Sequence, residues 1–192
     1  KMENKLRQGE YGTLQSVLEV QFTNRARRLP KWYNDLPLGL FFDEAAHFFY
    51  TAYRLGGDLE VLNAQAQYGK KKEATPMHLS IQCKAGDLPV QMFINSNSPV
   101  CEWLAILFCE KKIVIYDYFK DIIVTASNDG THQAKQVLRV CLQYAWTFWT
   151  GFLKNGFRMI TGNLLYGQYT VMQKYAAAIL DGQVDPALEA SS

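Results

Sequence analysis

The chain lacks the features that would assign it at once to a membrane, a secretory pathway or a nucleic acid. No uninterrupted apolar run reaches the roughly 18 residues that a membrane-spanning helix needs. The charged segment 1–7 has no signal-peptide core. The formal charge of +2 is nearly balanced, which argues against a polyanionic partner. We therefore expect a cytoplasmic protein with no nucleic-acid partner and no membrane partner.

Several catalytic motifs are missing too. The sequence contains no G-x-G-x-x-G, no P-loop and no G-x-S-x-G nucleophile elbow. None of its four cysteines stands in a C-x-x-C pair, so reduced thiols are expected at Cys83, Cys101, Cys109 and Cys141. The chain therefore offers no familiar phosphate cradle, no serine elbow and no disulfide framework of its own.

What is present indicates one α+β domain over residues 1–192. With 192 residues and 48% hydrophobic content, the chain is long enough to bury a core. Strand patterns occur at 13–22, 60–68, 77–83, 90–96, 103–109 and 113–118, and helical patterns at 43–56, 132–154 and 166–180. Runs of strands flanked by helices predict an open, mostly antiparallel sheet of six or seven strands, with helices on one face. Apolar residues on both parities, as at 103–108, predict that the other face meets a second subunit or a second domain.

The most informative stretch is a short helical segment that begins after Pro37. Asp43 and His47 lie four residues apart, on one face of a helix, and Tyr50 and Arg54 continue that polar edge. The other side is apolar, with Phe41, Phe42, Ala45, Phe48, Phe49 and Ala52. A carboxylate and an imidazole on a half-buried helix form a candidate proton-transfer site.

Two other interpretations of this pair stay open. Asp43–Glu44–x–x–His47 differs by one residue from H-E-x-x-H, the zinc-binding pattern. The remaining histidines, His78 and His132, have no ligand spacing, so we expect no metal. In the second interpretation His47 merely hydrogen-bonds Asp43 within a packed interface.

A dense aromatic cluster lies late in the long helical pattern. Its members are Trp146, Phe148, Trp149, Phe152 and Phe157. Core or interface packing is a better explanation for it than a ligand platform.

Residues 38–47 and the following Leu55–Gly56–Gly57 resemble a known family signature. They are similar to the G-G-x-x-x-D-x-x-x-H…L-G stretch of the glucose–fructose oxidoreductase, inositol dehydrogenase and rhizopine-catabolism (Gfo/Idh/MocA) oxidoreductases. Residues 7–14 resemble the turn and strand that open the family's second domain, and residues 168–182 its closing helix. Leu38 stands where the family usually has its first glycine.

This resemblance implies a substrate-binding C-terminal domain that dimerises through its open sheet. The family's N-terminal Rossmann domain holds NAD or NADP, and hydride moves between the nicotinamide and a hydroxyl-bearing carbon of a sugar or cyclitol. His47 would be the acid/base, since imidazole titrates near working pH. Asp43 would orient the substrate or help set the imidazole's charge.

The resemblance also suggests weaker candidates for substrate contact. Arg25, Arg28 and Trp32 precede the helix, and Tyr166 and Tyr169 begin the last one. The Rossmann fingerprint and the family's Glu-Lys-Pro segment are both missing. We therefore expect the substrate-binding half of a longer polypeptide, inactive and without cofactor on its own.

Two rival functions remain. One is a free-standing ligand-binding or dimerisation module without catalysis. The other is a metal-dependent hydrolase that uses Asp43 and His47.

Overall fold

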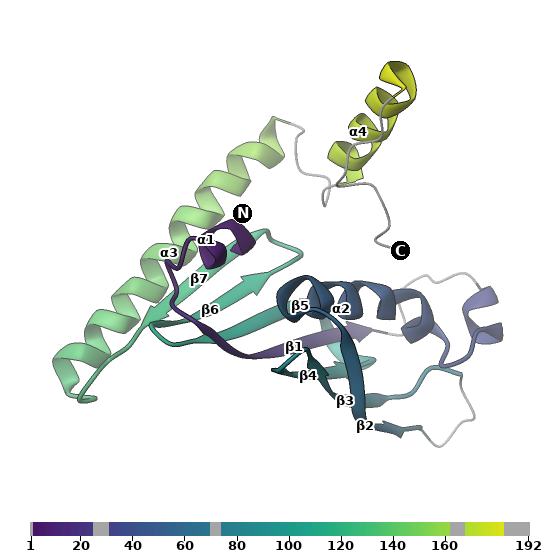
Figure 1. Cartoon of the computed structure of the whole chain (residues 1–192), viewed down its shortest axis with the longest axis horizontal. Helices are drawn as coiled ribbons and strands as arrows, with labels where there is room; N and C mark the ends of the chain where they lie inside the picture. The colour runs from purple at the N-terminus through teal and green to yellow at the C-terminus, as the bar shows by residue number, and fades with distance from the viewer. Residues whose placement is uncertain (1, 25–30, 70–73, 162–167, 183–192) are drawn as a thin grey trace.

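The computed structural model describes residues 2–24, 31–69, 74–161 and 168–182 (Figure 1). Its elements, in chain order, are α1 (Met2–Arg7), β1 (Leu14–Asn24), η1 (Lys31–Asp35), α2 (Leu40–Gly56), β2 (Leu59–Gln67), β3 (His78–Ala85), β4 (Leu88–Asn95), β5 (Asn97–Cys109), β6 (Lys112–Asp117), β7 (Ile122–Ser127), α3 (Ala134–Ile160) and α4 (Gln168–Asp181). The α+β class with an open, mostly antiparallel sheet is confirmed. Among the described helices, none is both long and apolar enough to cross a bilayer.

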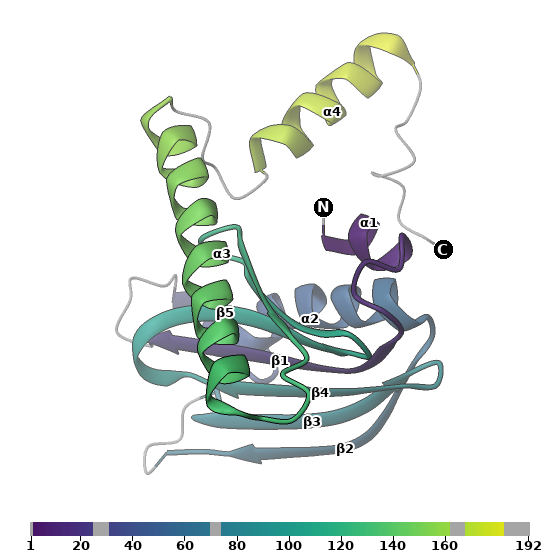
Figure 2. The same cartoon turned by 90° about the vertical axis from the view of Figure 1, so that its left-hand side faces the viewer.

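The seven strands form one sheet in the order β2-β3-β4-β1-β5-β6-β7. The first strand in the chain is therefore the central one, parallel to β4 and antiparallel to β5. All other neighbours are antiparallel. Figure 2 shows β2, β3, β4 and β1 lying successively side by side. The strand β7 was missed from the sequence, although its Ile-Ile-Val-Thr run is β-branched and favours a strand.

In the central strand β1 the polar side is more deeply buried than the apolar side. The apolar parity, with Leu18, Val20 and Phe22, is only half-buried, whereas the polar parity of Glu19, Gln21 and Thr23 is buried. The buried parity lies on the face that carries α2. The apolar parity faces the other way, where Leu18 continues across β5, β6 and β7 as the row Ile106, Ile115 and Val124. The open face is therefore more apolar along this strand than the covered one.

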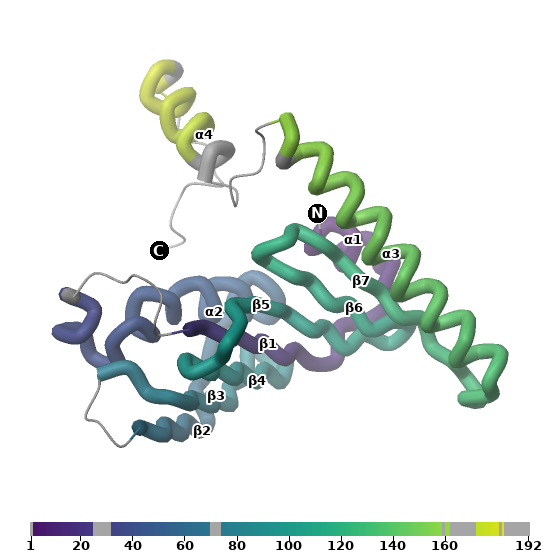
Figure 3. The backbone as a smooth tube through the Cα atoms, turned by 180° about the vertical axis from the view of Figure 1, so that it is seen from behind, coloured from purple at the N-terminus to yellow at the C-terminus, as the bar shows by residue number. Residues whose placement is uncertain are grey.

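The core lies between α2 and the sheet. From α2 it takes Phe41, Phe48 and Ala52, which pack with strand residues such as Met92 and Leu107. The helix α1 joins the same side through Glu3, whose carboxylate binds Arg54 on α2 at 2.8 and 3.1 Å. Figure 3 shows the back of this arrangement, with α3 along the outer edge of the sheet beside β7.

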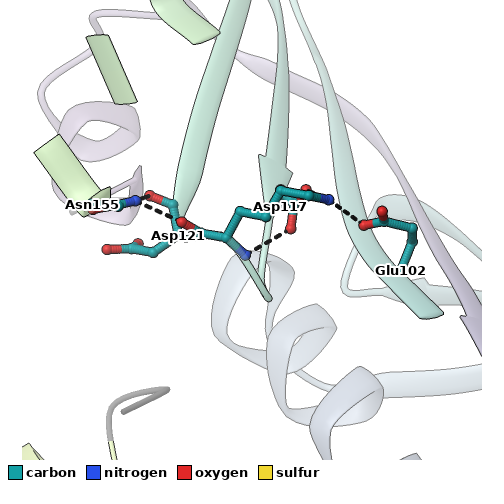
Figure 4. A network of polar contacts seen from close by, with 5 residues as sticks. Glu102, Asp117, Asp121 and Asn155 are labelled. Carbon is teal, nitrogen blue, oxygen red and sulfur yellow. Dashed lines mark hydrogen bonds and ion pairs between the residues drawn. The ribbon is translucent and has the colours of Figure 1, made fainter. Parts of the chain in front are cut away.

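A polar network ties α3 to the β6–β7 turn (Figure 4). The buried Asn155 donates from Nδ2 to the backbone carbonyls of Lys120 at 2.6 Å and Asp121 at 2.8 Å. Lys120 in turn binds Glu102 and Asp117 with its ammonium group. The contact between α3 and its own sheet is therefore partly polar.

Candidate functional site

The helix that carries Asp43 and His47 begins at a tightly constrained turn. Leu38 has φ 59° and Gly39 φ 57°, both in the left-handed region that favours glycine. A Cβ at Gly39 would lie 2.1 Å from Thr75 Oγ1. That hydroxyl accepts the N–H of Leu40 at 3.0 Å and so caps the helix from a distant segment.

The other end of α2 is held equally closely. A Cβ at Gly56 would lie 2.4 Å from the carbonyl oxygen of Ala85, so glycine lets the helix approach the β3–β4 hairpin. Gly57, with φ 92°, donates its N–H to Tyr53 O at 2.8 Å and ends the helix. The glycines of the sequence signature therefore fix both ends of the helix that positions the site.

Asp43 and His47 are both exposed on the outer side of α2. The Asp43 carboxylate accepts a hydrogen bond from the Tyr33 hydroxyl at 2.9 Å. Within the described residues, no hydrogen bond or ion pair joins Asp43 to His47. The two side chains thus lie one turn apart on a rigid helix, open to a ligand rather than paired with each other.

An aromatic row supports His47 from the sheet. Its imidazole lies 5.5 Å from the Trp103 ring, and Trp103 stacks on Tyr118 at 4.5 Å. Tyr118 donates to Thr51 Oγ1 at 3.1 Å, and Thr51 donates to the backbone carbonyl of His47 at 3.0 Å. Burial raises the pKa of the Tyr118 hydroxyl, so it stays a neutral donor. These contacts fix the turn of α2 that carries His47.

A buried acid on β1 belongs to the same face of the sheet. Glu19 is fully buried, and neither carboxyl oxygen has a hydrogen-bond partner among the described residues. Burial raises its pKa to about 8, against a smaller opposing effect from Trp103. The indole Nε1 of Trp103 is also buried without a partner. A pKa of about 8 favours the neutral form of the Glu19 carboxyl at pH 7 in the folded protein, and nothing in the sequence pattern singled this residue out.

The loop before α2 contributes one expected residue and one missed residue. Trp32, on η1, is half exposed and stacks on Tyr33 with ring centroids 4.1 Å apart. Because Tyr33 binds Asp43, the structure places Trp32 beside the candidate site through this neighbour. The sequence feature that could have pointed to Tyr33 is its position next to Trp32, in an aromatic segment that leads into the helix.

Four of the sequence candidates for substrate contact lie outside what the structure describes. Arg25, Arg28 and Tyr166 lie outside the described residues, as does the side chain of Tyr169. The helix that carries Tyr169, α4, stands apart from α2 in Figures 1 and 2. Arg54 of the polar edge is engaged with Glu3.

The described residues offer no metal cluster around Asp43 and His47. No group of three His, Cys, Asp or Glu side chains in the described ranges could hold a metal ion. Two cavities, of about 390 and 360 Å³, lie among β6, β7, α3 and neighbouring residues, and a small one of about 10 Å³ lies beside the start of α2. Neither Asp43 nor His47 lines any of these three cavities, so a substrate at this site would need a further wall from outside these residues.

The aromatic cluster of α3 does not lie in the core. Trp146, Trp149, Phe152 and Phe157 have exposed fractions between 50% and 72%. The sequence favoured core or interface packing for this cluster, and core packing is wrong for these four residues.

Comparison with known proteins identifies the fold but no close relative. No family model matches the sequence, and no curated protein matches it. A levoglucosan dehydrogenase bound to NADH matches 69% of this chain with a TM-score of 0.55 and 13% identity. A protein from Desulfitobacterium hafniense assigned as an NADPH-dependent oxidoreductase matches 66%, with 0.54 and 12%.

The same fold occurs in a super-repressor mutant of Gal80p from Saccharomyces cerevisiae, with a TM-score of 0.53, 15% identity and 66% of this chain covered. This chain spans only 40%, 42% and 39% of the three proteins, respectively. At such identities the likeness establishes a shared fold. The chain therefore has the fold of one portion of each of these three proteins.

Proposed function

We propose that this chain is the substrate-binding domain of an NAD(P)-dependent oxidoreductase acting on a hydroxyl-bearing carbon of a sugar, cyclitol or similar compound. The observation that carries the proposal is that Asp43 and His47 lie exposed, one turn apart, on a helix fixed at both ends within a fold shared with oxidoreductases. A levoglucosan dehydrogenase structure with NADH and levoglucosan supports the substrate class by analogy of fold.

In this proposal His47 exchanges the proton of the reacting hydroxyl. As the carbonyl forms, the imidazole would accept the O–H proton, and NAD or NADP, when bound by the full polypeptide, would supply the acceptor for the hydride. In the reverse direction His47 returns the proton to the new hydroxyl. Asp43, held by Tyr33, orients the substrate from one turn away on the same helix.

We propose that residues outside this chain hold the cofactor. The chain has no G-x-G-x-x-G unit, so nothing in its sequence offers the phosphate cradle of a dinucleotide. We assign NAD or NADP binding to a separate Rossmann domain and expect neither cofactor binding nor turnover from this chain alone. That domain would also supply the missing wall of the site. Arg28, Trp32, Tyr166 and Tyr169 remain proposed substrate contacts, and a cytoplasmic location remains a prediction.

We also propose that two copies associate through the open sheet face. The row Leu18, Ile106, Ile115 and Val124 crosses four strands and is apolar throughout. Its burial in a second copy would stabilise an isologous dimer. Light scattering of the wild-type chain and of the Ile106→Lys variant tests this, with a dimer and a monomer expected; a monomeric wild type would contradict it.

The function is tested on the natural polypeptide that contains these residues. The gene upstream of Lys1 should encode a G-x-G-x-x-G strand–helix unit and a Glu-Lys-Pro segment. The purified product should bind NAD or NADP and oxidise at least one member of a sugar and cyclitol panel. A gene that starts at this boundary, or a product that binds neither nucleotide, would contradict the proposal.

A second candidate is a ligand-binding or dimerisation module without catalysis. The likeness to a protein described as a repressor shows that this fold occurs outside proteins named as enzymes. This function predicts sugar binding without turnover, and Asp43→Asn would then weaken binding while no cofactor-dependent rate exists. Stoichiometric metal in the purified protein would instead favour the hydrolase alternative.

A further inference from the structure

The helix α3 packs against β7 with a largely polar side. An ordinary amphipathic helix packs against its sheet with its apolar side. The side toward β7 carries Gln143, Thr147, Gly151 and Asn155, spaced four residues apart. Gln143 donates to Thr125 Oγ1 and accepts the N–H of Ser127, both at 3.2 Å. Small and polar groups therefore make much of the contact that apolar side chains usually make, together with the half-buried Val140 and Tyr144.

The opposite side of α3 is a continuous apolar stripe. Its members are Leu138, Leu142, Trp146, Trp149, Leu153, Phe157 and Ile160, each with an exposed fraction between 54% and 86%. Spacings of four or three residues keep them on one face for six turns. An aromatic side chain has a surface of about 150–250 Å². At the exposed fractions above, the stripe exposes on the order of 1,000 Å² of apolar surface, which is more than the largest apolar patch of an ordinary monomer.

The segment that carries this stripe has charges of a single sign. Residues 130–180 contain the five cations Lys135, Arg139, Lys154, Arg158 and Lys174 and no acidic residue, although Arg158 forms an ion pair with Asp121 on the sheet side. All 18 acidic residues lie elsewhere, together with the other 15 cations. Lys135 and Arg139 are exposed one turn before Leu138 and Leu142 on the stripe. Such an asymmetry between regions points to an anionic partner.

We propose that α3 lies on an anionic lipid surface with this stripe inserted into the headgroup region. A contact between two copies of α3 would bring two acid-free, cationic helices together, whereas an anionic bilayer complements the charge. Tryptophan favours the membrane–water boundary, and the stripe has two. In Figures 1 and 3, α3 lies along the outer edge of the sheet, beside β7.

The expectation of no membrane partner rested on the absence of a spanning stretch and on the balanced net charge. A helix that lies in the surface requires neither, because its apolar residues face one side only. α4 exposes further apolar side chains, among them Met172, Tyr175 and Ile179, which the same surface would cover.

Co-sedimentation with lipid vesicles tests the proposal. The chain should bind vesicles of one part phosphatidylglycerol to two parts phosphatidylcholine at least about tenfold more tightly than pure phosphatidylcholine, and less tightly in high salt. The double variant Trp149→Gln/Leu153→Gln should lose at least about tenfold of this binding. Lys135→Gln/Arg139→Gln should lose about 25-fold, since each basic residue contributes about fivefold at an anionic surface.

Val61→Gln/Leu62→Gln is the matched control. These two residues are about as exposed as Trp149 and Leu153, with fractions of 54% and 55%, but lie on β2 at the other edge of the sheet. This variant should bind vesicles like the wild type. Equal binding by all variants would overturn the proposal, as would no binding to anionic vesicles.

Two further experiments test whether protein, rather than lipid, covers the stripe: light scattering, and vesicle binding by the natural polypeptide. If the chain fails to bind vesicles and Trp149→Gln/Leu153→Gln converts a dimer to monomers, the stripe is a contact between copies and the proposal is wrong. If this chain binds vesicles but the longer natural polypeptide does not, another part of that polypeptide covers the stripe, and the proposal is again overturned.

Discussion

The helices α2 and α3 are both amphipathic, yet they use the sheet in opposite ways. α2 buries Phe41, Phe48 and Ala52 against the strands and leaves Asp43 and His47 in the open. α3 places glutamine, threonine, glycine and asparagine against β7 and leaves its leucines and tryptophans exposed. The comparison teaches that the apolar side of α2 is buried against the strands, whereas the apolar side of α3 is left uncovered by the part of the chain that the structure describes.

The largest difference between the two helices should appear when an apolar side chain is removed from each. Phe48→Ala, at a residue with no exposed surface, should cost about 4 kcal/mol of unfolding free energy through the cavity it leaves. Trp149→Ala, with half of its surface exposed, should cost less than about 0.5 kcal/mol. Urea denaturation measures both. Equal losses would mean that α3 is packed as tightly as α2.

The two ends of α2 offer a second, smaller contrast. Gly39→Ala should cost about 3 kcal/mol, because its Cβ would meet Thr75 Oγ1 at 2.1 Å in a left-handed conformation. Gly57→Ala has the same conformational strain but nothing within 4 Å, so about 1 kcal/mol is expected. Thermal unfolding of the two variants separates steric contact from strain. Equal losses of stability in the two variants would mean that the close contact with Thr75 does not constrain the start of the helix.

Buried Glu19 should make stability depend on pH. Its folded pKa is about 8, above the ordinary value of 4.5, so the folded state binds more protons between these limits. The contribution of Glu19 to stability is therefore greatest below pH 4.5 and falls as the pH rises toward 8. Between pH 5.5 and 7.5 the wild type should lose about 2.5 kcal/mol relative to Glu19→Gln. Parallel pH profiles of the two proteins would show that the carboxyl is solvated or paired.

The smallest effect concerns Leu38. Its φ of 59° is one that glycine adopts freely, and the resembling family usually has glycine there. Leu38→Gly should raise the unfolding free energy by about 1 kcal/mol, as the strain of the left-handed leucine is relieved. A lower melting temperature would instead assign Leu38 a packing role.

The sequence predicted the class of the fold and the site helix better than the arrangement of the strands. The glycines at 39, 56 and 57 bound α2 as expected, because local turns and close approaches decide them. The central position of β1 and its parallel pairing with β4 depend on contacts between distant segments, which no local pattern encodes.

The face of β1 was harder to foresee for the same reason. Alternation distinguishes two parities but does not say which one a helix will cover, and here the polar parity with Glu19 is the buried one. Tyr33 and Trp103 escaped notice because their relation to Asp43 and His47 arises only in three dimensions. Arg28, Tyr166 and Tyr169 stay predictions.

The central claim is that His47 moves the proton of the reacting hydroxyl. The most direct test is the turnover of the natural polypeptide with its nucleotide and an active sugar or cyclitol, compared with the His47→Gln variant. The account predicts that kcat falls by about 10²–10⁴ while nucleotide binding is unchanged. A variant that keeps the wild-type kcat and pH profile would contradict it.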